Sequence, residues 1–151
     1  MKRFRGAAIA ALAAGWCLAL GCSSSAQHQS GNNIVEEHLG PWHHNQSFTV
    51  ISQDGCHVAY AVARGNKWRA VVDGKEGPPY DEIDKRSLMF SPDGKRVAYL
   101  AKKGEKWLEV LDGREGPLYD EMPGSPIFRA DGTLEHLAVK DGVLLRVKQV
   151  P

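Results

Sequence analysis

The sequence has only three cysteines in 151 residues, Cys17, Cys22 and Cys56. Two of them lie near the N-terminus, so the rest of the chain has a single cysteine and cannot close an internal disulfide. We interpret Cys56, which follows a predicted turn, as a small residue near the start of a strand. A reactive or intermolecular thiol is the alternative reading of this position.

Acidic residues are missing from the N-terminal end of the chain. The first 21 residues contain no acid, and Lys2, Arg3 and Arg5 give this segment three of the 19 basic residues. The chain from Cys22 onward therefore has 16 basic and 18 acidic residues, which is a net charge of −2. Because this part offers no basic patch to hold phosphates, the composition argues against nucleic acid as a partner.

No hydrophobic run is long enough to span a bilayer comfortably. The apolar, Ala-rich run of residues 6–20 follows a basic start, whereas a membrane-spanning helix needs about 20 apolar residues. A basic start followed by a short apolar run is the pattern of a secretory signal peptide. We therefore predict that residues 1–21 direct export.

The end of this segment, Ala19-Leu20-Gly21-Cys22 followed by three serines, resembles the lipobox of bacterial lipoproteins. In that family the signal is cut before the cysteine and the thiol is acylated, which implies that Cys22 is the lipid attachment site. The sequence departs from the commoner pattern, which has leucine and then a small residue where Ala19 and Leu20 stand. More than one acyl chain anchors a domain stably at a membrane.

The resemblance implies an exported protein with a lipid anchor in the bacterial cell envelope. Serine after the cysteine resembles Gram-negative lipoproteins of the outer membrane, so we expect the periplasmic side of that membrane. An ordinary cleaved signal with an unmodified Cys22 is the alternative. Residues 23–33 are polar, contain Ser and Gly, and show no apolar period. We therefore predict a flexible tether over residues 22–33 and a folded domain over residues 34–151.

The folded part is organised by a repeat. The turn pairs Asp54-Gly55, Asp93-Gly94 and Asp131-Gly132 are 39 and then 38 residues apart. A fixed period in this range is the signature of a repeat architecture. Residues 49–83 and 90–122 are two copies of one unit, and residues 126–150 are a shorter third copy.

Each unit reads as short strands joined by turns. In the second copy we expect strands at residues 87–90, 96–101 and 106–111, and a weaker fourth strand over residues 118–122. Ser91-Pro92-Asp93-Gly94 predicts a type I turn, and Asp112-Gly113 predicts a two-residue hairpin. The strand over residues 96–101 is apolar on both sides, which is typical of a strand covered on both faces. Turn signals leave no room for a long helix.

Four antiparallel strands followed by an immediate repeat predict propeller blades, which bury both faces by stacking around an axis. The sequence FSPDGKRVAYLA at residues 90–101 and its diverged copy ISQDGCHVAYAVA at residues 51–63 resemble the WD-like β-propeller repeats of the TolB type. The unit at residues 106–121 resembles a version found in tandem in bacterial exported proteins. The fold expected is all-β, with four-stranded antiparallel blade repeats that make about three blades of a partial propeller.

The third copy stops before its fourth strand, and residues 37–44 look like an orphan one. They share Gly-Pro and then an aromatic residue, Gly40-Pro41-Trp42, with residues 75–82 and 114–121. Three blades are fewer than the roughly 4–8 of a closed ring. Two chains making a six-bladed homodimer is one hypothesis, and a monomeric twisted array is the other. A partner protein that supplies blades and a degenerate remnant are further alternatives.

Candidate chemistry is sparse, and we predict no catalytic residue, no cofactor and no metal. His38, His43 and His44 cluster with His57 in the sequence, but adjacent strand residues point to opposite faces, so packing is expected rather than metal binding.

The repeated Tyr80-Asp81-Glu82 and Tyr119-Asp120-Glu121 are read as a packed tyrosine followed by acids that face water or cap a turn. Trp68 and Trp107 are expected to stack between blades. Ser91 suits a turn and has no adjacent base.

The function expected from these patterns is a membrane-anchored, non-catalytic binding or scaffold module with a protein or peptide ligand. A carbohydrate-binding propeller, using a ring of aromatic side chains, is an alternative. A propeller hydrolase or lyase that uses carboxylates such as Asp81 or Glu121 is another. The short connections between strands argue against the enzyme, because catalytic propellers usually carry long insertions.

Overall fold

The computed structural model describes residues 27–30, 34–37 and 48–150. These residues form thirteen β-strands and contain no helix. They make sheets of four, four and three strands and a separate two-stranded sheet, and every pairing is antiparallel. The prediction of an all-β chain is therefore confirmed. The orphan segment of residues 37–44 lies outside the described residues except for Glu37.

The two-stranded sheet stands at the end of a first compact unit, residues 1–37, and is described by itself. It consists of β1 (Gln27–Ser30) and β2 (Ile34–Glu37), which pair from Gln27 opposite Glu37 to Ser30 opposite Ile34. The strand β1 falls within the predicted tether.

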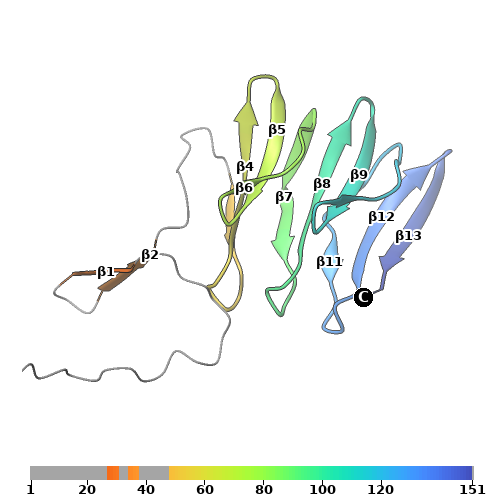
Figure 1. The fold of residues 1–151 in the computed structure, drawn as a ribbon. Helices are drawn as coiled ribbons and strands as arrows, with labels where there is room; N and C mark the ends of the chain where they lie inside the picture. Colours follow the sequence, from red (N-terminus) through yellow and green to blue (C-terminus); the bar gives the residue numbers. More distant parts are fainter. Residues whose placement is uncertain (1–26, 31–33, 38–47, 151) are drawn as a thin grey trace, which may run out of the picture. The chain divides into compact units, whose positions relative to one another are not determined.

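The second unit, residues 38–151, contains three sheets that stand side by side in sequence order (Figure 1). The first sheet has the order β3 (Thr49–Ile51), β4 (Val58–Arg64), β5 (Lys67–Val72) and β6 (Lys75–Glu76). The second has β7 (Glu82–Phe90), β8 (Val97–Lys103), β9 (Lys106–Leu111) and β10 (Arg114–Glu115). The third has β11 (Ile127–Phe128), β12 (Leu134–Lys140) and β13 (Val143–Gln149).

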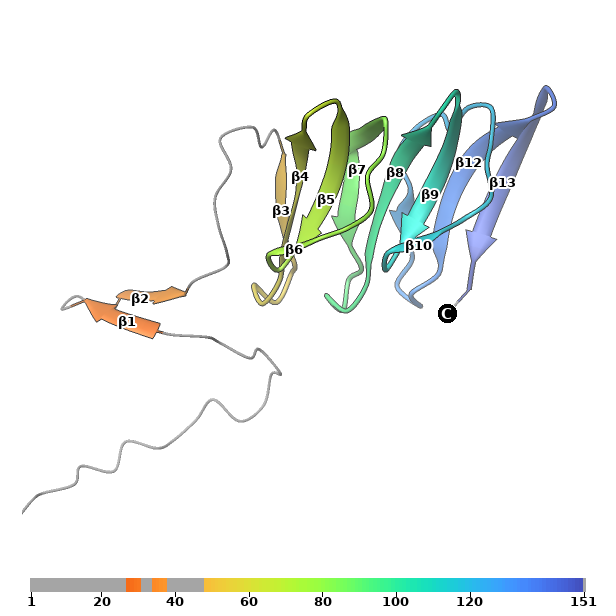
Figure 2. The same ribbon diagram turned by 45° about the horizontal axis from the view of Figure 1, so that its top comes forward.

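Figure 2 shows the same row from another side, with the first sheet in yellow to green and the third in blue. The described residues make an open row and not a closed ring. The second strands β4 and β8 have the same burial along their length, with five buried residues before an exposed end. Val58 and Val97, at matching places, are 7% and 8% exposed. The prediction that these strands are covered on both faces is confirmed.

The sheets pack face to face, and the contacts repeat. Tyr80, which follows the first sheet, packs edge-on against Tyr99 of the second, with ring centroids 6.1 Å apart. Tyr119, which follows the second sheet, packs in the same way against His136 of the third, with centroids 6.0 Å apart. Burying an apolar side chain of this size contributes roughly 1.5–3 kcal/mol. The repeated tyrosine is thus a packing residue between neighbouring sheets.

The predicted turns are present. The backbone N–H of Gly94 donates to the carbonyl oxygen of Ser91 at 2.9 Å, and Gly94 has a φ of 72°. Asp112 and Gly113 join β9 to β10 with φ angles of 51° and 77°. Two positive φ angles are characteristic of the type I′ hairpin, whose twist matches that of the strands.

The predicted fourth strand is wrong in its position. Over residues 118–122 the structure has two isolated bridges, Tyr119 to Trp107 of the second sheet and Glu121 to Val139 of the third. The strand that pairs with β9 is instead the short β10. The chain therefore crosses from one sheet to the next at these residues, because the backbone groups of Tyr119 and Glu121 bond to different sheets.

The first strand of the second sheet is longer than the predicted residues 87–90. β7 pairs with β8 from Glu82 to Asp84, loses register, and pairs again at Met89 and Phe90. Ser87 is fully buried at this irregularity, where its hydroxyl donates to the carbonyl of Asp84 at 2.5 Å and accepts from the N–H of Leu100 at 2.7 Å. A single serine thereby satisfies backbone groups that the interrupted ladder leaves open.

Candidate functional site

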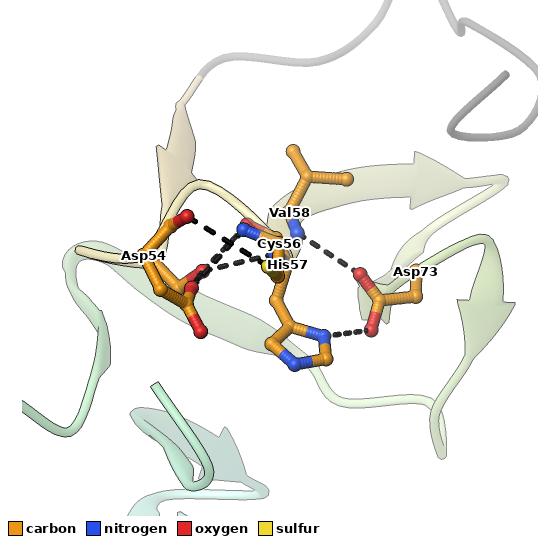
Figure 3. Close-up of polar contacts among 6 residues, drawn as sticks. Asp54, Cys56, His57, Val58 and Asp73 are labelled. Carbon is orange, nitrogen blue, oxygen red and sulfur yellow. Dashed lines mark hydrogen bonds and ion pairs between the residues drawn. The ribbon is translucent and has the colours of Figure 1, made fainter. Parts of the chain in front are cut away.

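At one end of the strands, the turn between β3 and β4 is held by a set of polar contacts (Figure 3). The hydroxyl of Ser52 lies 2.5 Å from Asp54 Oδ1 and accepts from the N–H of His57 at 2.9 Å. Asp54 Oδ1 also accepts from the N–H of Cys56 at 3.0 Å. The hydrogen bond from Ser52 is the main reason that the pKa of Asp54 is lowered. In the second sheet Ser91 and Asp93 repeat this arrangement.

His57 and Asp73 face each other beside this turn. The Nδ1 atom of His57 lies 2.8 Å from Asp73 Oδ2, and the other carboxylate oxygen accepts from the N–H of Val58 at 3.0 Å (Figure 3). In the second sheet Arg96 and Asp112 make the equivalent contact at 3.0 Å. The histidine therefore occupies a position where the repeat places a cation. It is the only member of the sequence cluster His38, His43, His44 and His57 among the described residues.

Metal binding has no support within residues 27–30, 34–37 and 48–150, which contain no group of three His, Cys, Asp or Glu able to hold an ion. Cys56 is disulfide-bonded, so it is more than the small residue expected near the start of a strand. The proposed lipid attachment site, Cys22, lies outside the described residues. No helix of the described part of the chain is long and apolar enough to cross a membrane.

The repeated acids lie at the opposite end of the strands, next to the hairpins. Asp81 lies 2.5 Å from the ammonium of Lys67 and accepts from the N–H of Gly104, in the hairpin of the next sheet, at 2.8 Å. Asp120 repeats both contacts with Lys106 and with the N–H of Asp141. The lysine in each pair is the main cause of the lowered pKa of the aspartate. Each aspartate joins two sheets and caps a turn, which agrees with the packing role expected from recurrence.

The two tryptophans lie at matching places near this end. The backbone of Trp68 exchanges two hydrogen bonds of 2.8 Å with Tyr80, and Trp107 does the same with Tyr119 at 2.9 and 2.8 Å. The ammonium of Lys85 lies 3.9 Å from the centre of the Trp68 ring, and that of Lys102 lies 5.7 Å from the Trp107 ring. Lys85 belongs to the second sheet and Trp68 to the first, so this contact contributes to packing between sheets, whereas Lys102 and Trp107 are cross-strand partners within the second sheet.

One buried ionisable pair stands out between the second and third sheets. Glu109 and His136 are 4% and 6% exposed, and His136 Nδ1 lies 2.7 Å from a carboxylate oxygen of Glu109. Neither ring nitrogen makes a hydrogen bond of ordinary geometry, so the contact is a close approach of the imidazole to the carboxylate. The sequence reasoning missed this pair. The sequence does contain a signal for this pair: His136 stands at the place of Tyr99, and Glu109 at the place of Ala70, in the repeat.

Among the described residues, a groove along the first strands of the three sheets is a surface suited to a ligand. It is open, has a volume of about 580 Å³, and is mainly apolar. Each of β3, β7 and β11 is an edge strand among the described residues, and Ile51 and Ile127 are 66% and 57% exposed. Its lining comprises Val50, Ile51, Gln53, Leu88, Met89, Phe90, Ser91, Pro92, Pro126, Ile127 and Phe128.

No protein-family model, no curated protein and no solved structure matches this chain.

Proposed function

We propose that the chain is an exported bacterial lipoprotein whose repeat domain is a non-catalytic binding or scaffold module. The three sheets are blades of the WD-like, TolB-type propeller repeat. The domain is held by acyl chains on Cys22 at the periplasmic side of the outer membrane. Its ligand is a protein segment or peptide that lies in the groove along β3, β7 and β11.

The groove carries this proposal. Its walls are edge strands, which leave backbone N–H and C=O groups able to pair with an extended segment, and apolar side chains can supply further contact area. The exposed Ile51 and the half-buried Phe90 belong to different sheets, so a segment that pairs along one edge strand would also contact side chains of the neighbouring sheet. A surface assembled from separate rigid sheets suits presentation of fixed contacts to a partner.

The repeated acids support a binding role over a catalytic one. Asp81 and Asp120, the first acids of the two repeated motifs, each bond to a lysine and to a backbone N–H of the next sheet. Those contacts use both carboxylate oxygens of each residue. The side chains are thereby engaged in holding the row together and lie outside the groove lining.

Site-specific photo-crosslinking in the native cells tests this proposal. A benzophenone amino acid at Ile51 is expected to capture a partner that protease digestion removes, and Met89→Lys should abolish the adduct. The same group at Leu118, an exposed leucine on another part of the row, is the control. A glycosidase-sensitive adduct would favour the carbohydrate alternative. Equal capture at Leu118, or no adduct at Ile51, would contradict the groove as the binding surface.

A further inference from the structure

Among the described residues, the third sheet lacks the fourth strand that the first two sheets have. In the first sheet the outer edge of β5 is covered by β6 and Tyr80, and the N–H of Gly77 donates to the carbonyl of Ala70 at 2.8 Å. In the second sheet β10, Tyr119 and the N–H of Gly116 cover β9 in the same way. No described residue pairs with the outer edge of β13. Its backbone groups form an open edge at the end of the row (Figure 1).

The outer face of the third sheet is also uncovered at the hairpin end. Leu137 and Leu144 are 41% and 62% exposed. Leu100, the counterpart of Leu137 in the second sheet, is 1% exposed because the next sheet lies over it. The opposite half of the face is polar, with Lys148 and Arg129 both bonded to Glu135. An occupant is therefore expected near Leu144, where Trp68 and Trp107 make their bridges in the other sheets.

The sequence contains a segment of the missing type. Gly40-Pro41 is followed directly by the aromatic Trp42, whereas Gly77-Pro78 in the first sheet is followed by Tyr80 after one intervening residue. In the structure, the residues after each such pattern continue into the next sheet, as Tyr80 leads to β7. Residues 37–44 precede β3. By the same rule, they would complete a sheet on the side of the first sheet that faces away from the second. The third sheet of the same chain lies at the opposite end of the row (Figure 2).

We propose that residues 37–44 of a second copy of this chain pair with the open edge of β13, and that two copies do so reciprocally. Two rows of three sheets then make six, which lies within the roughly 4–8 blades of a closed ring. The new contact is carried by backbone pairing along β13 and by the apolar area around Leu137 and Leu144. This inference does not depend on the lipid anchor or on the groove.

Sedimentation of the full exported chain carrying Cys22→Ser, which keeps it free of lipid, tests the proposal. The expected species at about 10 µM is a dimer. Leu144→Lys should weaken dimerisation by at least about tenfold, as truncation of a central contact does, while Leu118→Lys should leave it unchanged. Both leucines are exposed, at 62% and 48%, so neither change disturbs a core. A monomer at this concentration, or a dimer indifferent to Leu144→Lys, would overturn the proposal.

Disulfide trapping identifies the pairing itself. Trp68 and Tyr80 exchange two backbone hydrogen bonds, and such opposed residues lie about 5.5 Å apart between Cα atoms, within disulfide range. A chain with Trp42→Cys, mixed with a differently tagged chain with Leu144→Cys, should give a mixed dimer on oxidation. Leu118→Cys in place of Leu144→Cys should not. A single chain with both substitutions that closes on itself as a monomer would show that the pairing is internal and overturn the proposal.

Discussion

The imidazole of His136 lies 2.7 Å from the carboxylate of Glu109, and the pair is buried between the second and third sheets. At the matching places between the first and second sheets stand Tyr99 and Ala70, which have no charge. One interface in the row is thus built around an ionisable pair and the other around apolar contacts. The difference shows that the repeat constrains the shape of the interface more tightly than its chemistry.

Removing one partner of this pair should be destabilising, because the other is left buried without its partner. We expect His136→Ala to lower the free energy of unfolding by about 3–5 kcal/mol. The double variant Glu109→Ala with His136→Tyr copies the first interface and should be neutral or more stable by about 1–4 kcal/mol. Urea unfolding of both variants measures this. A double variant less stable than His136→Ala would contradict the equivalence of the two interfaces.

The carboxylate of Asp81 should protect one backbone amide of the neighbouring sheet. Its Oδ2 atom accepts from the N–H of Gly104, just as Asp120 accepts from the N–H of Asp141. We expect Asp81→Ala to speed hydrogen exchange at Gly104 and to leave Asp141 unchanged, since only the first amide loses its acceptor. Asp120→Ala should produce the reverse pattern. If the exchange rates of both amides were unchanged in these variants, the carboxylates would not join the sheets.

Acid should weaken the third sheet through Glu135. The guanidinium of Arg129, together with the ammonium of Lys148, lowers the pKa of Glu135 from 4.5 to about 2. Because the folded-state pKa is depressed, these ion pairs stabilise the fold above about pH 4.5, and that stabilisation is lost as the pH falls toward 2. The melting temperature of Glu135→Gln should therefore fall less than that of the wild type between pH 5 and pH 2.5.

Salt supplies the control for this prediction. The Debye length shortens to about 3 Å at 1 M salt, so exposed ion pairs are largely screened there. The difference in acid sensitivity between the two proteins should then shrink. An equal acid response of wild type and Glu135→Gln at low salt would assign the loss of stability to other carboxylates.

The anchor is tested by fractionation of the native cells. Under the lipoprotein proposal, Cys22→Ser yields a folded domain that no longer pellets with membranes, because more than one acyl chain is needed for stable attachment. Intact mass of the mature wild-type chain gives a second readout, since acylation at Cys22 raises the mass of the chain. A variant that still pellets would end the proposal of a lipid anchor at this residue.

The sequence predicted the features that depend on local periodicity and turn chemistry. The repeat spacing, the doubly covered strands around Val58 and Val97, and the Asp112-Gly113 hairpin are present as expected. These features can be read from the sequence because continuous apolar runs, β-branched residues and turn residues act over a few neighbouring positions.

The features that the sequence did not give depend on contacts between distant residues. The crossing at Tyr119 and Glu121 could not be foreseen, because these neighbours bond to different sheets. The role of Ser87 in an interrupted ladder depends on the register of β7 against β8. The groove along the first strands exists only once three sheets are stacked, so it cannot be predicted from any single segment of the sequence.

The central claim is that one sheet unit is repeated and that each copy packs on the next through the same positions. The most direct measurement is of nuclear Overhauser effects between aromatic side chains in the folded chain. The account predicts cross-peaks between the ring protons of Tyr80 and Tyr99, and equivalent ones between Tyr119 and His136. Ring contacts at one interface with none at the other would contradict it.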